Sequence, residues 1–422
     1  MSERSERTAR HGAARSADRA QRGSAVTEHP TEEYAAVAPL TRGDVRTRAR
    51  RRRRRTLATV LAVLLLAGGV LGGGYLLYRE FDGPPDYDGD GGGNVIVQVQ
   101  QGATGAEIGR ALQRADVVKS VEAFTAAAAD EPRVRSVQPG YYNLRRQMAG
   151  RSAVALLLAP DTRVGQLEIR GGVQLDDTSN PDGSVVPGVL SLISDATCAQ
   201  LDGERRCVTP DQLREAMATA DPAALGVPTW AREDVARAEP GRRLEGLLVP
   251  GRYDVAPGTP APEVLRGVLT ASTSKLESDG LVSGARGIGY TPYKVLVVAS
   301  LVEKEGITPD MPKVARVLYN RLGAGQRLQL DSTVNYPLDR QALRTNEADR
   351  TRPGPYNSYA TPGLPPTPIA APGREAIAAA LEPAEGPWQF FVRCRADGSS
   401  CFAQTLDEHN RNVAEAVANG AF

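Results

Sequence analysis

The chain has 422 residues, of which 24% are charged and 41% hydrophobic, a length that suggests two or three domains. The net charge of +1 conceals a basic head, since residues 1–55 carry 15 Arg against 7 acidic side chains (net +8), and residues 56–422 carry 36 basic and 43 acidic ones (net −7). This division argues against nucleic acid as the main partner of the folded part, and three histidines, two of them in the head, exclude a histidine-rich zinc centre.

The first predicted elements are a disordered cytoplasmic head over residues 1–55 and a transmembrane anchor over 56–78. The head has too few large apolar side chains to offset the entropy of ordering. The anchor, TLATVLAVLLLAGGVLGGGYLLY, is uncharged and long enough to cross about 30 Å of hydrocarbon. The arginines at 50–55 precede it, so the positive-inside rule puts the N-terminus in the cytoplasm and the rest outside. A cleaved signal peptide or a buried core helix are the alternatives.

Four cysteines lie on the predicted outer side: Cys198 and Cys207 are nine residues apart, Cys394 and Cys401 are seven apart, and the connectivity stays open. Two short-range disulfides are the economical interpretation in an oxidising compartment. Buried free thiols are the alternative, and a zinc site would need closer spacing.

After a flexible linker over residues 79–93, residues 94–162 are predicted to form a small α+β module. NVIVQVQ alternates like a strand, and Thr104 can cap a helix that carries Ile108, Ala111, Leu112 and Val117 on one side. A second helix, SVEAFTAAAAD, the strand YYNL and a short helix, SAVALLLA, follow. The module indicates binding, positioning or spacing rather than chemistry.

Residues 163–422 are predicted to form a second α+β domain. VGQLEIRGGVQL opens it with strand structure, and residues 172–210, rich in Asp, Gly, Ser and Pro, are predicted to be a disulfide-stapled insertion. Residues 210–240 and 262–277 have helical patterns, and LEGLLVPGRYDVAPGT, which contains Glu245, indicates strand and turn.

The stretch TPYKVLVVASLVEKEGITPDMPKVARVLYNRL carries the strongest chemical signal. It predicts a helix that begins after Thr291 and ends at Gly306. Leu296, Ala299, Ser300 and Glu303 share one stripe, whereas Glu305 points about 200° away from Glu303. Contact with the core would raise the pKa of Glu303, as a general acid near neutral pH requires. The alternative is that both glutamates form a solvated helix end.

Several longer motifs resemble those of the endolytic murein transglycosylases, the YceG-like (MltG) family. They are VASLVEKEG with KVARVLYNRL and RLQLDSTVNYPL, YNSYATPGLPPTPIAAPGREAIAAALEPA, FVRCRADGSSCFAQTLDEHNRNV and LEGLLVPGRYDVAPGT. The resemblance covers residues 56–422. It implies a single transmembrane helix, a small LysM-like module and an α+β catalytic domain over 163–422.

The resemblance implies a lyase that cuts peptidoglycan glycan strands internally, between N-acetylmuramic acid and N-acetylglucosamine, and leaves 1,6-anhydro ends. One carboxyl acts first as general acid and then as general base toward the sugar's own C6 hydroxyl, so a second carboxylate is not needed. The motif places this role on Glu303, with Glu305 as second candidate. No metal or cofactor is implied.

The same motifs make other polar residues candidates for contact with the glycan, since amides, hydroxyls and aromatic rings suit N-acetyl sugars. A purely structural hydrogen bond is as strong an expectation for each of them. The candidates are Glu245, Asn320, Arg321, Gln329, Asp331, Tyr356, Asn357 and Tyr359.

Departures from the family pattern place substrate contacts near Arg170 and Cys401 in doubt, because the family commonly has an acidic residue and a histidine there. Family membership further implies a cell-membrane location, termination of nascent glycan strands, and partnership with peptidoglycan synthases and the elongation or division machinery. Two rival functions stay open. One is a glycan hydrolase, for which Glu245 or Asp331 would be the second carboxylate, and the other is a wall-binding scaffold without turnover.

Overall fold

The computed structural model describes residues 59–73, 83–201, 203–338 and 345–421, and the chain divides into two units, Met1–Asp82 and Gly83–Phe422. In the first unit, residues 59–73 are helical and their apolar side chains are exposed. Within the described ranges, no helix combines the length and the apolar character that crossing a membrane demands. The predicted anchor 56–78 extends beyond the described helix at both ends, and the predicted head 1–55 lies outside the described residues.

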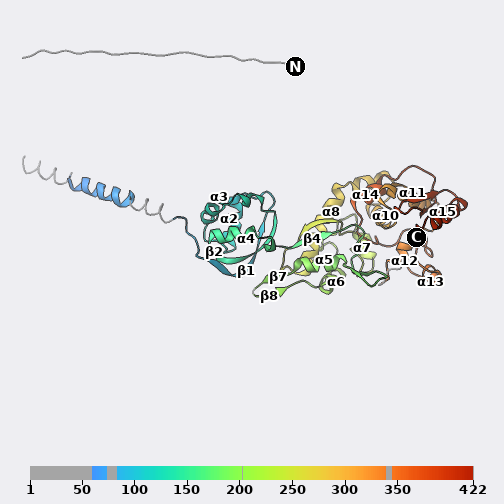
Figure 1. Cartoon of the computed structure of the whole chain (residues 1–422), viewed down its shortest axis with the longest axis horizontal. Coiled ribbons are helices and arrows are strands. Elements are labelled where there is room, and N and C mark those ends of the chain that lie inside the picture. The colour runs from blue at the N-terminus through green and yellow to red at the C-terminus, as the bar shows by residue number, and fades with distance from the viewer. Residues whose placement is uncertain (1–58, 74–82, 202, 339–344, 422) are drawn as a thin grey trace, which may run out of the picture. The chain divides into compact units, whose positions relative to one another are not determined.

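The second unit begins with the predicted α+β module, in which helices pack on an antiparallel sheet of order β1-β2-β3 (Figure 1). Thr104 caps α2 as predicted, because its hydroxyl accepts from the Glu107 N–H at 3.3 Å while the Glu107 carboxylate accepts from the Thr104 N–H at 2.7 Å. The core contains Leu112, Phe124 and Leu144, all fully covered. The elements are β1 (Asp90–Val99), α2 (Gly105–Arg114), α3 (Val121–Ala129), the 3₁₀ turn η1 (Pro132–Ser136), β2 (Gly140–Met148), α4 (Gly150–Leu157), η2 (Pro160–Thr162) and β3 (Arg163–Val164).

The predicted linker is partly structured. Strand β1 begins at Asp90, so its glycine-rich start pairs with β2 from the register Asp90 opposite Met148 onward. Before it, the Asp86 carboxylate accepts from the Gly150 N–H at 3.0 Å at the start of α4, and the Pro85 carbonyl accepts from the Ser120 hydroxyl at 2.7 Å. Composition predicted flexibility, but these long-range hydrogen bonds attach residues 85–90 to the module.

The larger domain is mostly helical, with short two-stranded sheets that pair β4 with β9, β5 with β6, β7 with β8 and β10 with β11. Its elements are β4 (Gln166–Ile169), β5 (Thr178–Ser179), β6 (Val185–Val186), α5 (Val189–Thr197), β7 (Ala199–Leu201), β8 (Glu204–Arg206), α6 (Pro210–Thr219), α7 (Arg232–Arg237), β9 (Gly251–Asp254), α8 (Ala261–Ser278), α9 (Leu281–Gly287), α10 (Pro292–Glu305), η3 (Thr308–Asp310), α11 (Met311–Gly323), α12 (Asp331–Asn335), α13 (Glu347–Thr351), α14 (Arg374–Leu381), β10 (Phe390–Arg393), β11 (Ser400–Ala403) and α15 (Leu406–Ala418).

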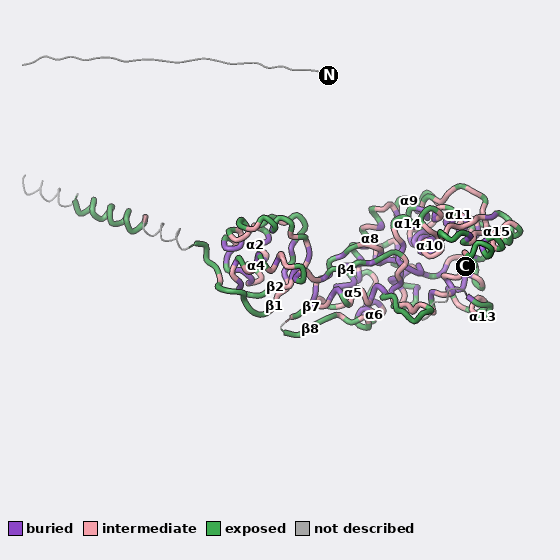
Figure 2. Tube along the Cα trace, in the orientation of Figure 1, coloured by how far each residue is buried: buried purple, intermediate pink, exposed green. Residues whose placement is uncertain are grey.

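Helix α10 lies inside this domain and contacts α9, α11, α12 and α14. All residues from Val295 to Val302 are buried, as the purple trace of α10 in Figure 2 indicates. The predicted stripe of Leu296, Ala299 and Ser300 is buried, but so are the other residues between Val295 and Val302, as expected for a helical segment that is apolar all round. The VASLVEKEG motif therefore lies on a helix, α10, that is packed rigidly in the centre of the domain.

Residues 172–210 are more than a stapled insertion. Val189, Leu190 and Ile193 of α5 belong to the main hydrophobic core, with at most 1% exposure. The sequence did not indicate this contribution to the core, because the residues on either side of α5 are mostly polar. Both predicted disulfides are present, Cys198–Cys207 closing the β7–β8 hairpin and Cys394–Cys401 closing the β10–β11 hairpin.

Candidate active site

The candidate site is built around Glu303 on the last turn of α10. Thr291 caps the start of this helix by accepting from the Lys294 N–H at 3.3 Å, and Gly306 follows its end. The Glu303 side chain is half-buried. The apolar part of α10 thus fixes a carboxyl at the border between the core and the surface.

Two glycine-containing segments enclose the Glu303 carboxyl, and we call segments 171–173 and 371–373 together the glycine clamp. They hydrogen-bond to each other like a short pair of strands: the Gly172 N–H donates to the Ala371 carbonyl at 2.9 Å, and the Ala371 N–H donates to the Val173 carbonyl at 2.8 Å. A Cβ at Gly171 would lie 2.4 Å from Glu303 Oε1. A side chain at this position would occupy the space of the carboxyl, so the close approach requires glycine.

The other half of the clamp contacts the second carboxyl oxygen. The Gly373 N–H, at the N-cap of α14, donates to Glu303 Oε2 at 2.9 Å. Burial raises the pKa of Glu303, the Gly373 hydrogen bond lowers it, the nearby Glu375 charge raises it, and Lys304 lowers it, with a net increase over the ordinary value. A carboxyl shifted in this direction can hold a proton for delivery near neutral pH.

Glu375 is a second carboxylate close to Glu303, and it is not among the site residues predicted from the sequence. It lies exposed in the first turn of α14. A Cβ at Gly373 would have Glu303 Oε2 at 3.2 Å and Glu375 Oε2 at 3.6 Å, so the two carboxylates flank the same glycine. In the sequence this region is part of the family motif YNSYATPGLPPTPIAAPGREAIAAALEPA, and the motif does not indicate which side chains face each other.

The neighbours of Glu303 in the motif have separate surroundings. The Lys304 ammonium donates to the Gly172 carbonyl at 3.4 Å, and burial lowers its pKa despite the surrounding carboxylates. Glu305 accepts a hydrogen bond from Ser332, and burial is the main cause that raises its pKa. Because Glu305 faces α12 and Glu303 faces the clamp, the predicted divergence of the two carboxyls is confirmed.

Asp331 is held as a carboxylate by donors from three other residues. The hydroxyls of Thr345 and Tyr359 donate to Oδ1 at 2.5 and 2.8 Å, and Arg350 donates to Oδ2 at 3.3 Å. Burial alone would raise the pKa of Asp331, but these hydrogen bonds lower it below its usual range. Tyr359 is thereby bound to Asp331, and the Arg350 guanidinium lies 5.0 Å from its ring centre.

The two candidate glycan-binding residues on α11, Asn320 and Arg321, form hydrogen bonds to other parts of the protein. Asn320 donates to the carbonyls of Gly386 and Trp388 at 3.0 and 2.8 Å. Arg321 is 8% exposed and donates to the carbonyls of Gln389 and Leu328, and burial lowers its pKa. These hydrogen bonds fix the loops that follow α11 and α14.

The remaining candidates divide into one exposed and three enclosed residues. Gln329 is exposed, with a φ of +55°. Asn357 is buried and its amide donates to three carbonyls at the end of α13 and just after it, and buried Tyr356 shares a hydrogen bond of 2.9 Å with Thr367. Glu245 is 3% exposed. The role of these residues in substrate binding stays a prediction.

The structure also shows the surroundings of Arg170 and Cys401, the two residues that depart from the family pattern. The Arg170 side chain is 81% exposed and pairs with Glu168 at 3.7 Å, directly before Gly171 of the clamp. Cys401 forms a disulfide with Cys394. Among the described residues, no group of three or more His, Cys, Asp and Glu side chains is arranged to hold a metal ion.

Comparison with known proteins gives consistent matches. The model of the YceG-like family matches residues 97–415. An endolytic murein transglycosylase of Bacillus subtilis is 27% identical over 345 residues, covering 81% of this chain and 89% of the relative. One of Streptococcus pneumoniae is 28% identical over 359 residues, and the match covers 82% of this chain but 62% of that longer relative.

Among solved structures, a YceG-like protein of Listeria monocytogenes superimposes with a TM-score of 0.50 at 23% identity. The match covers 75% of this chain and 98% of that protein. At this identity the likeness concerns the fold alone.

Proposed function

The chain belongs to the YceG-like family, and from this premise we propose that it is an endolytic murein transglycosylase whose acid and base is Glu303. The named relatives support the reaction class. The observation that carries the assignment of Glu303 is its half-buried carboxyl, held by the Gly373 N–H between the two halves of the glycine clamp. A fixed, partly desolvated carboxyl is the group that acid catalysis on a glycosidic bond requires.

In the proposed reaction, protonated Glu303 gives its proton to the glycosidic oxygen, and the bond from that oxygen to C1 of N-acetylmuramic acid breaks. The resulting carboxylate takes the proton of the C6 hydroxyl on the same sugar, and O6 closes on C1. The carboxyl is thereby regenerated, and neither water nor a nucleophile of the protein is consumed. The raised pKa of Glu303 favours the protonated starting state.

The rival hydrolase needs a second carboxylate across the scissile bond. Asp331 is occupied by its three donors, and Glu245 is enclosed, which disfavours both carboxylates named in the sequence analysis. Glu375 is the exposed carboxylate that flanks Gly373 with Glu303. A hydrolytic reaction would therefore depend on Glu375, whereas the transglycosylase reaction would not use it as a nucleophile or base.

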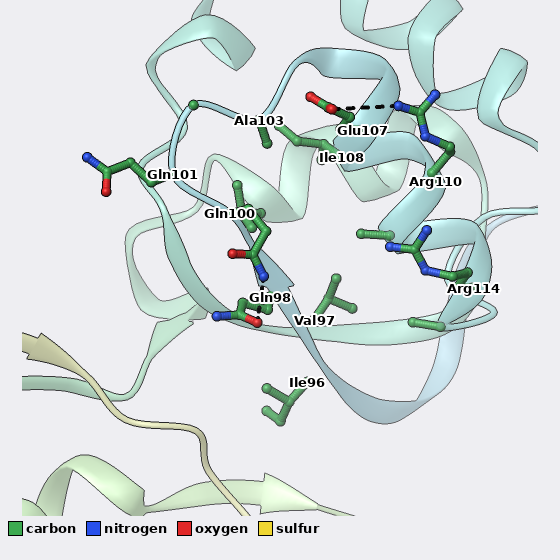
Figure 3. A pocket seen from close by; sticks show the side chains of 14 residues that line it. Ile96, Val97, Gln98, Gln100, Gln101, Ala103, Glu107, Ile108, Arg110 and Arg114 are labelled. Atoms are coloured by element: carbon green, nitrogen blue, oxygen red, sulfur yellow. Dashed lines mark hydrogen bonds and ion pairs between the residues drawn. The ribbon is translucent and has the colours of Figure 1, made fainter. Parts of the chain in front are cut away.

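The N-terminal module is proposed to be LysM-like and to hold the glycan strand. Its two long strands flank two helices, as in the predicted arrangement. A cavity of about 640 Å³ lies along β1 and α2, and Figure 3 shows the amides of Gln98 and Gln100 and the guanidinium groups of Arg110 and Arg114 around it. Side-chain amides and guanidinium groups suit hydroxyl and N-acetyl groups of a sugar polymer.

Membrane attachment and topology belong to the same proposal. The uncharged residues 56–78 follow a run of arginines, so the N-terminus would be cytoplasmic and the module and catalytic domain extracytoplasmic. Two disulfides in the larger domain agree with an oxidising compartment. At this location the enzyme would act on strands made by peptidoglycan synthases of the elongation or division machinery.

Mass spectrometry of glycan products tests the proposal, with the full chain in detergent and purified strands as substrate. Anhydro ends from the wild type and none from Glu303→Gln are expected, with Glu382→Gln, an exposed glutamate, as matched control. Reducing ends that disappear in Glu375→Gln would instead establish the hydrolase. Binding of strands without cleavage by any variant would establish the scaffold.

A further inference from the structure

Glu245 is an enclosed carboxyl for which the proposed chemistry has no direct use. It lies in the turns after α7, and its Oε2 accepts from the Leu175 N–H at 3.2 Å and from the Tyr336 hydroxyl at 2.9 Å. Burial raises its pKa to about 7, against the lowering influence of these two donors and of Arg242. Enclosing an ionisable group is costly, so its retention needs a local reason.

Both halves of the glycine clamp lie close in the chain to residues that contact Glu245 or Gly246. Leu175, which donates to Glu245, is two residues after the half that begins with Gly171. Gly246, with a φ of +72°, packs so closely on Pro368 that a Cβ there would lie 2.3 Å from the proline Cβ. Pro368 leads into the other half of the clamp, which contains Gly373. Glu245 and Gly246 therefore contact the chain just after one half of the clamp, at Leu175, and just before the other half, at Pro368.

An aromatic and cationic cluster supports the same attachment. The Arg242 guanidinium lies 4.8 Å from the ring centre of Tyr336 and 5.9 Å from that of Tyr356. The two rings are themselves 4.8 Å apart. Tyr356 shares its hydroxyl hydrogen bond with Thr367, the residue before Pro368. The cluster thus packs against Tyr336, which donates to Glu245, and holds Thr367, which precedes the second half of the clamp.

We propose that Glu245 is a positioning residue for Glu303, which it orients through the glycine clamp. This inference rests on the proposed function, in which Glu303 transfers the proton. It replaces the expectation of a sugar contact at Glu245, because a side chain that is 3% exposed and spent on two internal donors offers the substrate no face. A misplacement of about 1 Å at the reacting group can cost about 10²-fold in rate.

The test is steady-state kinetics of the full chain on purified glycan strands, comparing Glu245→Ala, Glu245→Gln, Tyr336→Phe and the control Glu382→Gln. Glu245→Ala should lower kcat about 10- to 100-fold while KM changes less than about twofold, since the clamp moves but the glycan surface does not. Glu245→Gln keeps an oxygen acceptor and should recover most of that loss. Because a smaller folded fraction would also lower the apparent kcat at unchanged KM, kcat is expressed per folded molecule, with the folded fraction taken from urea unfolding.

Three results would overturn the inference. The first is a rise in KM alone, which would indicate a sugar contact. The others are a wild-type kcat in Glu245→Ala and an equal loss of kcat in the Ala and Gln variants. If Glu245→Ala does not fold, Tyr336→Phe decides, because it removes one donor only, and kcat must then fall at unchanged KM. Absence of anhydro products from the wild type would refute the proposed function itself, whereas anhydro products with an unaffected Glu245→Ala would refute only this inference.

Discussion

Replacing Gly171 by alanine tests whether the clamp sets the working position of Glu303. The added methyl would lie 2.4 Å from Glu303 Oε1, whereas ordinary contacts begin at 3.4 Å, so the carboxyl must retreat by about 1 Å. Retreat would also disturb the hydrogen bond from Gly373, which is 2.9 Å long. The expected result is a fall in kcat of about 10²-fold, equal to about 2.7 kcal/mol of activation free energy.

Stability should not change in parallel, which makes the substitution informative. Gly171 is exposed and its φ lies outside the left-handed region, so alanine is conformationally acceptable there. Restricting the unfolded chain at such a position contributes about 0.4–1 kcal/mol of stability. The free energy of unfolding should therefore stay within about 1 kcal/mol of the wild type.

Two further glycines provide a graded comparison in the same assay. A Cβ at Gly373 would meet Glu303 Oε2 at 3.2 Å and should cause a smaller loss, and one at Gly267 in α8 would meet nothing within 4 Å and should cause none. Release of anhydro ends from glycan strands gives kcat, and urea unfolding gives stability. Wild-type kcat in a folded Gly171→Ala variant would refute the reasoning, because the carboxyl would then work from another position.

Further predictions concern charge and covalent structure. Because Glu375 helps to raise the pKa of Glu303 and the protonated acid is the reactive form, Glu375→Gln should move the alkaline fall of kcat/KM to lower pH, and an unmoved profile would contradict the coupling. The pKa of Glu245, raised from 4.5 to about 7, implies that its contribution to stability is complete below pH 4.5 and is lost as pH rises through 7, about 3 kcal/mol in all. Unfolding curves at pH 5 and pH 8 should show this loss in the wild type and not in Glu245→Gln, and equal pH dependence would argue against it. Replacing both Cys394 and Cys401 by serine should cost about 2.5 kcal/mol of unfolding free energy, measured in urea against the oxidised wild type, and an unchanged free energy would contradict this.

The sequence alone determined the features that depend on neighbouring residues. Hydrophobic period and capping residues located α2 and α10, since Thr104 and Thr291 satisfy backbone donors within three residues of themselves. Short spacing favoured two local disulfides, and the structure contains both of them. The motif around Glu303 marked it as the candidate acid, and helix geometry separated its side chain from that of Glu305, because both residues sit on one helix.

Only the tertiary structure decided what surrounds that acid. Gly171, Gly373 and Glu375 lie far from Glu303 in the chain, and no local pattern states which loops will hydrogen-bond to each other across the end of a helix. The same holds for Asn320 and Arg321, whose polar side chains suggested a sugar surface but are occupied by carbonyls of distant loops. Backbone donors and acceptors of irregular segments must find partners when buried, and which side chain meets that need depends on the complete packing.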